Sequence, residues 1–138
     1  MTTATRYHDF SAGHRVHNHE SKCAHLHGHN YRVHFTVSAD ALDHIGRIMD
    51  FGVIKTLLCQ WLEDHWDHRF LVWRQDPMVD ALRTLDPDGV VAVPFNPTAE
   101  AMAEYLVQHI GPSQLKGTGV RLIRVTIEET AKCSASYE

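Results

Sequence analysis

The chain has 138 residues, of which 43% are hydrophobic and 22% are charged, and its net charge is -4 with the histidines counted as neutral. This size and balance fit one compact globular domain and exclude a disordered chain or a membrane protein. The mild acidity also argues against nucleic acid as the main partner, because neutralising phosphates requires a basic surface.

Two strands are predicted in the first third of the chain. Residues 5–14 are expected to form the first strand, and the polar, histidine-rich residues 15–26 a loop. From His27 onward, apolar and polar residues alternate, and this period of two is typical of a half-buried strand. The apolar members of the alternation are Tyr31, Val33, Phe35 and Val37.

Two helices are predicted in the middle of the chain. Asp50 is a candidate N-cap, and the apolar residues that follow recur at spacings of three and four, as on one face of a helix. Residues 71–89 are expected to be irregular because they contain turn signals, and residues 90–93 are a short strand candidate. Either Asn96 or Thr98 can cap a second helix, which Gly111-Pro112 is expected to end.

The last part of the chain completes the predicted fold. Residues 120–129 are expected to form a strand and residues 134–137 a last short one. The order of elements is then ββααββ. Hairpins at both ends with helices between them indicate an α+β domain, with an antiparallel sheet that carries two helices on one face.

A metal site is predicted where the first two strands meet. His27 and His29 are two positions apart, so on a strand their side chains share a face, roughly 7 Å apart along the backbone. If the two strands pair antiparallel, His14 at the end of the first lies beside them. Three neutral imidazoles without a fourth protein ligand are typical of a catalytic zinc site with an open position. The alternative is a chance pair in a chain with 12 histidines.

Cys23 lies in the loop just before the histidine pair and is a candidate reactive thiol. A thiol acts as thiolate, and a nearby cation lowers its pKa. The alternative is that Cys23 is a fourth ligand that closes a structural zinc site. Cys59 and Cys133 are expected to have no functional role. Three cysteines without framework spacing, in a sequence without an apolar leader or a bilayer-spanning run, predict a reducing, cytoplasmic setting.

Two further groups carry chemistry but have plain alternatives. Asp67 and His68 follow the first helix and can form a proton relay, although Asp and His are also common at solvated helix ends. Glu129 continues an inward-facing row of strand residues. A buried carboxylate needs donors, and a ligand with a planar pair of N–H groups would supply them. Alternatively, Glu129 lies beyond the strand end in solvent.

Taken together, these residues resemble the 6-pyruvoyl-tetrahydropterin synthase / 6-carboxy-tetrahydropterin synthase family. The resemblance extends in order over nearly the whole chain. It is carried by Gly13-His14-Arg15, Lys22-Cys23, His27-Gly28-His29-Asn30-Tyr31, Met49-Asp50-Phe51, Asp67-His68, Asn96-Pro97-Thr98-Ala99-Glu100 and Glu128-Glu129-Thr130. It implies one tunnelling-fold domain over residues 1–138, whose sheet joins those of other subunits in a barrel, usually a homohexamer built from two trimers.

The resemblance also implies roles for the residues. His14, His27 and His29 would hold Zn²⁺, Cys23 would be the base or nucleophile, and Glu129 would anchor a pterin ring. Asp67 and His68 would reach Cys23 from a neighbouring subunit. The substrate would be 7,8-dihydroneopterin triphosphate.

Three residues separate Cys23 from His27. This compact spacing is similar to that of the carboxy branch, which releases acetaldehyde and leads to queuosine and other deazapurines. The pyruvoyl branch is the alternative product class. A non-catalytic zinc-stabilised binding module is the alternative of another kind, and a cupin-type oxygenase is disfavoured because two helices interrupt the strands.

Overall fold

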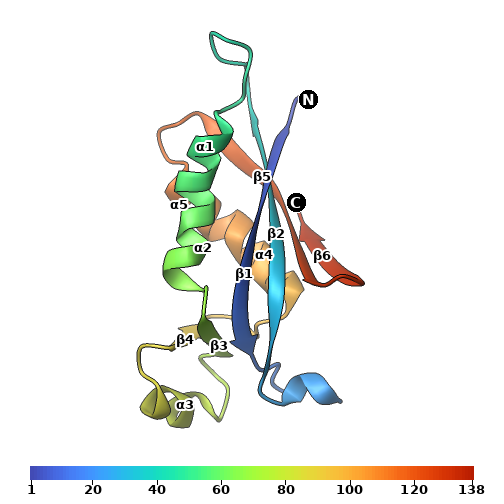
Figure 1. Cartoon of the computed structure of the whole chain (residues 1–138), viewed down its shortest axis with the longest axis vertical. Helices are drawn as coiled ribbons and strands as arrows, with labels where there is room; N and C mark the ends of the chain where they lie inside the picture. Colours follow the sequence, from blue (N-terminus) through green and yellow to red (C-terminus); the bar gives the residue numbers. More distant parts are fainter.

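A computed structural model describes residues 1–138 and shows a six-stranded sheet in the order β4-β3-β1-β2-β5-β6 (Figure 1). The strands are β1 (Ala4–His14), β2 (His27–Ala39), β3 (Arg69–Trp73), β4 (Val90–Val93), β5 (Val120–Thr130) and β6 (Cys133–Tyr137). Antiparallel pairing joins β1, β2, β5 and β6, whereas β3 and β4 extend the sheet in parallel. The predicted α+β class is confirmed, but the sheet is mixed rather than purely antiparallel.

The prediction of irregular structure over residues 71–89 is wrong. This stretch contains most of β3 and the short helix α3 (Val79–Leu85). The strand was missed because Arg69–Trp73 is a short run with two fully buried residues, Leu71 and Val72, and does not alternate. Periodicity cannot distinguish such a run from other buried segments.

Two longer helical segments pack against the sheet. The first comprises α1 (Phe51–Ile54), a π-helical turn at Lys55–Cys59, and α2 (Gln60–His65). The second comprises α4 (Ala99–Tyr105), a π-helical turn at Leu106–Ile110, and α5 (Gly111–Gln114). Asp50 caps the first helix by accepting a hydrogen bond from Gly52 N at 2.6 Å. Thr98, rather than Asn96, caps the second by accepting from Ala101 N at 3.1 Å. None of these helices is long and apolar enough to cross a bilayer.

The second helix does not end at Gly111-Pro112, as the sequence predicted. The π-helical turn precedes Gly111, and Pro112 lies in the first turn of α5. Gly111 itself is required for packing, because a Cβ there would lie 2.7 Å from Leu122 Cβ of β5.

The hydrophobic core lies between these helices and one face of the sheet, called here the inner face. Along β1 and β2 the inner-face residues, such as Phe10, Ala12, Tyr31 and Val33, are buried, and their neighbours are not. The sequence predicts an inward row of Ile123, Val125 and Ile127 before Glu129. A shift in register between β2 and β5 puts Leu122 in that row in place of Ile123. The other face, the outer face, is polar.

The remaining elements gather at one end of the sheet. Figure 1 shows β3, β4 and α3 at the lower end, close to the turn that joins β1 to β2. This end contains the C-terminus of β1 and the N-terminus of β2, and therefore His14 and His27.

Candidate metal centre and active site

Three imidazoles converge on the inner face at this end of the sheet. His14 is fully buried, and His14 and His27 are directly paired across β1 and β2. The ligand nitrogens of His14, His27 and His29 all lie within 4.8 Å of one another. Strand alternation explains the arrangement, because His27 and His29 share a face with the last residue of the neighbouring strand.

Backbone carbonyls fix the orientation of two of the rings. His14 Nδ1 donates a hydrogen bond to Pro97 O at 2.6 Å, and His27 Nδ1 donates to His25 O at 2.8 Å. In a neutral imidazole, a proton on Nδ1 leaves Nε2 unprotonated, with a free lone pair. The two Nε2 atoms lie 3.1 Å apart and therefore present two lone pairs to each other. A cation between them removes this repulsion.

The donor set fits Zn²⁺. Tetrahedral zinc with Zn–N bonds of about 2.0–2.1 Å places its ligand nitrogens about 3.3 Å apart, close to the observed 3.1 Å. His29 Nε2 is buried and has no hydrogen-bond partner. Burial also lowers the pKa of His14 and of His29, which keeps both rings in the neutral form that a metal requires.

Glu129 reaches the same centre from β5. Its Oε1 lies 3.3 Å from His14 Nε2 and 3.2 Å from His29 Nε2. The pairing of β5 with β6 skips Glu129, because Glu128 pairs with Ser134 and Thr130 with Cys133. Such a β-bulge re-aims one side chain, here towards the metal centre. The carboxylate is therefore on the inner face and not in solvent beyond the strand end.

Cys23 lies in the short turn Lys22–Ala24 and is partly buried. Its carbonyl accepts a hydrogen bond from Val16 N at 2.9 Å, which closes the loop over the end of β1. Cys23 is also near enough to Tyr31 to be one of the groups that raise the pKa of its phenol, after burial and Glu129. The compact ligand group contains the three imidazoles and does not contain Cys23.

Asp67 and His68 form the expected pair, but on the outer face. His68 Nδ1 donates to Asp67 Oδ2 at 2.7 Å, and Asp67 Oδ1 accepts from Ser11 N at 3.0 Å. The His68 side chain is 79% exposed, and its backbone is left-handed with φ 57. Both residues line a pocket together with the outer-face residues Ser11 and Asn30, so within one chain the sheet separates this pair from the three imidazoles.

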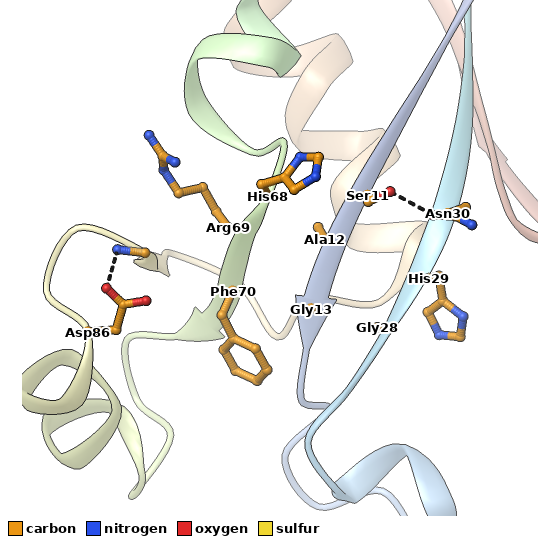
Figure 2. A pocket seen from close by; sticks show the side chains of 11 residues that line it. Ser11, Ala12, Gly13, Gly28, His29, Asn30, His68, Arg69, Phe70 and Asp86 are labelled. Carbon is orange, nitrogen blue, oxygen red and sulfur yellow. Dashed lines mark hydrogen bonds between the residues drawn. The ribbon is translucent and has the colours of Figure 1, made fainter.

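An outer-face pocket lies next to His68 (Figure 2). Gly13 and Gly28, which are paired across the strands, form a floor without side chains, and Phe70 packs at its edge. In Figure 2 His68 lies beside β1 near Ser11, whereas His29 projects beyond β2.

Sequence reasoning missed Tyr31 as a residue of the site. The ring lies on the inner face, 5.5 Å from the His29 ring and 5.9 Å from the His14 ring. Its hydroxyl is buried without a hydrogen-bond partner. The alternation of β2 placed Tyr31 in the core, but no pattern in the sequence indicates that its hydroxyl would lack a partner.

The comparisons with known proteins agree with this geometry. A sequence model described as 6-pyruvoyl tetrahydropterin synthase matches residues 3–138. The chain belongs to the 6-pyruvoyl tetrahydropterin synthase family. The fold described above is thus that of a pterin synthase family member, as the sequence resemblance indicated.

Relatives and solved structures support the same assignment. A 6-carboxy-5,6,7,8-tetrahydropterin synthase from Rickettsia felis is 31% identical over 134 residues, covering 96% of this chain and 97% of that protein. One from Aquifex aeolicus is 33% identical over 126 residues, covering 86% and 76%. The structure of Caenorhabditis elegans 6-pyruvoyl tetrahydropterin synthase has a TM-score of 0.69 at 25% identity, covering 99% and 94%. An uncharacterized protein from Wolinella succinogenes shares the fold with a TM-score of 0.84 at 24% identity, covering 99% and 97%.

Proposed function

We propose that this protein is a zinc-dependent carbon–oxygen lyase that converts 7,8-dihydroneopterin triphosphate to 6-carboxy-5,6,7,8-tetrahydropterin, with release of acetaldehyde and triphosphate. The product feeds the formation of queuosine and related deazapurines. The observation that carries the proposal is the convergence of three imidazoles on one centre, in a chain that a pterin synthase model matches over residues 3–138.

The carboxy product is preferred over the pyruvoyl product for two reasons. The relatives from Rickettsia felis and Aquifex aeolicus are both named 6-carboxy-5,6,7,8-tetrahydropterin synthase. The short spacing between Cys23 and His27 also resembles that branch. Both branches start from the same substrate, so the distinction lies in how the side chain is cleaved.

Each site residue has a proposed role. His14, His27 and His29 would hold Zn²⁺, which supplies a Lewis acid that polarises an oxygen of the substrate side chain. Cys23 Sγ would take a proton from the substrate. His68 would return one through Nε2, because Asp67 already holds its Nδ1.

Glu129 is proposed to orient the pterin by accepting hydrogen bonds from its planar N–H edge. Its side chain is 26% exposed and stands beside the imidazoles, so a ring bound there would place its substituent at the metal centre. Bidentate hydrogen bonds to a carboxylate fix both position and orientation.

The location of Asp67 and His68 supports an oligomeric active site. Within one chain they line a pocket with the outer-face residues Ser11 and Asn30, whereas the imidazoles converge on the inner face. We propose that residues 1–138 form a single tunnelling-fold domain that assembles as a homohexamer of two trimers. A neighbouring subunit would then bring its Asp67 and His68 to Cys23.

Incubation of the purified protein with 7,8-dihydroneopterin triphosphate, followed by mass analysis of products, tests the proposal. The expected products are 6-carboxy-5,6,7,8-tetrahydropterin and acetaldehyde. Cys23→Ala should keep one zinc per chain and lose turnover, whereas Cys133→Ala, at an exposed cysteine, should keep both. A pyruvoyl product would assign the sister reaction. No consumption, together with unfolding on chelation, would favour the non-catalytic binding module.

A further inference from the structure

The loop that carries Cys23 is held by the guanidinium of Arg15. Arg15 Nε donates to Asp76 Oδ2 at 2.8 Å, and Nη1 donates to Ala24 O at 2.8 Å. Nη2 lies 3.2 Å from His17 Nδ1. One planar group thus ties both ends of residues 15–26 to a segment 61 residues away in the sequence.

Asp76 is one of the few charged residues in the interior and has no part in the chemistry proposed above. It is 1% exposed, and its second oxygen accepts from Met78 N at 2.9 Å. Burial raises the pKa of this carboxyl, but the hydrogen bonds from Arg15 and Met78 and the charge of Arg15 lower it below the usual value. A buried, ionised carboxylate is retained only when its partners are fixed.

A second pair of hydrogen bonds holds the same loop at His17. Asn96 Oδ1 accepts from His17 N at 3.0 Å, and Asn96 Nδ2 donates to His17 O at 2.9 Å. The next residue, Pro97, accepts the hydrogen bond that orients His14. The Cys23 loop and the ligand His14 are therefore fixed by adjacent residues of one segment.

We propose that Arg15 and Asp76 are positioning residues that hold the Cys23 turn in a single geometry against the metal centre. The proposal rests on the proposed function, in which Cys23 is the reactive thiol. Arg15 acts through the carbonyl of Ala24, the residue that directly follows Cys23 in the chain. A displacement of a reacting group by about 1 Å can cost 100-fold in rate, so a clamp on this turn has a direct effect on turnover.

The geometry requires arginine rather than any cation. The guanidinium directs Nε and Nη1 in different directions at once, towards Asp76 and Ala24 O. Lysine is a point charge on a flexible stem and cannot hold both acceptors in one plane. Arg15→Lys therefore keeps the positive charge beside Asp76 but loses the simultaneous hydrogen bonds to Asp76 and Ala24 O.

Two variants and a matched control test the clamp. Arg15→Lys and Asp76→Asn should each lower kcat by about 10- to 100-fold, with KM within about twofold and zinc content unchanged. Asp43→Asn removes a comparable Arg–Asp contact, Arg47 Nε to Asp43 Oδ2 at 2.7 Å, outside the site, and should leave kcat unchanged. If Asp76→Asn fails to fold, Arg15→Lys carries the test.

Hydrogen exchange supplies a readout that needs no substrate. The amide of Val16, which donates to Cys23 O, should exchange at least tenfold faster in both variants, while amides in the middle of β2 keep their wild-type rates. Unchanged Val16 exchange or unchanged kcat would overturn the proposal, and loss of zinc would show that the pair supports His14 instead. Turnover by the wild-type protein tests the proposed function alone. The proposed function and the positioning role of Arg15 and Asp76 can therefore fail separately.

Discussion

Gly28→Ala is a direct test of whether the spacing of β1 and β2 sets the metal centre. A Cβ at position 28 would lie 2.9 Å from Ala12 O and 3.4 Å from Gly13 Cα, both backbone atoms of β1. Backbone cannot rotate away, so the strands must separate by about half an ångström to restore normal contact. His14 is on one strand and His27 and His29 are on the other, so this separation pulls the ligands apart.

The expected magnitude follows from that displacement. Overpacking a well-packed site costs about 1–3 kcal/mol of unfolding free energy. The ligand nitrogens of His14 and His27 are now 3.1 Å apart, and metal–ligand distances tolerate changes of only about 0.2 Å. Zinc affinity should therefore fall by about 10- to 100-fold, in the range seen when the surroundings of metal ligands are disturbed.

Urea unfolding of the metal-free protein and competition with a zinc chelator measure the two quantities. Gly13→Ala is the control, because its Cβ would meet Phe70 Cδ2 at 2.5 Å, and this atom belongs to a partly exposed side chain that can rotate. Gly13→Ala should change zinc affinity by less than about threefold. Wild-type zinc affinity in Gly28→Ala, or an equal loss in Gly13→Ala, would refute the argument from strand spacing.

Three further predictions follow from the described contacts. In the metal-free protein, the free energy of unfolding should be highest above about pH 6.5, the ordinary histidine pKa, and should fall as the pH drops below it. The reason is that burial lowers the pKa of His14 and His29 in the folded protein, so that only the unfolded chain binds the protons. The slope reaches at most about 1.4 kcal/mol per pH unit for each histidine. Urea unfolding at pH 7.5 and 5.5 measures this, and equal stability at both would contradict it. Thr98→Ala removes the acceptor for Ala101 N and should cost about 1 kcal/mol in the same assay, so an unchanged midpoint would show that the cap is not needed. Asp67→Asn should lower turnover by about 100-fold or more at constant zinc content, because Asp67 orients His68; a normal rate would remove the pair from the mechanism.

The parts of the fold that could be predicted are those with a clear local period. The alternation from Tyr31 to Val37 gave β2 and its buried face, and Asp50 marked the start of the first helix. The same alternation placed His27 and His29 on one face, and the antiparallel pairing of β1 with β2 confirms that His14 lies beside them. The ligand cluster thus follows from patterns within 16 residues of sequence.

The remaining features depend on contacts between distant residues or on irregular strands. In the sequence, Asp76 followed by Pro77 indicates only a turn within residues 71–89, because nothing local indicates that Arg15 would reach it. Glu129 was undecided between the interior and solvent, because its direction depends on a bulge against β6. Asp67 and His68 could be recognised as a pair, but their place beside β1 depends on the hydrogen bond to Ser11, which is 56 residues away in the sequence.

The tripeptide Asn96–Thr98 links the start of α4 to the metal ligand. Pro97 O steadies His14, and the next residue caps the helix. Fraying of the first turn of α4 would therefore loosen an imidazole that zinc needs, and bound zinc would in turn resist that fraying. Metal capture and the docking of this helix form one cooperative event, so zinc should protect amides in α4 that lie well outside its own coordination shell.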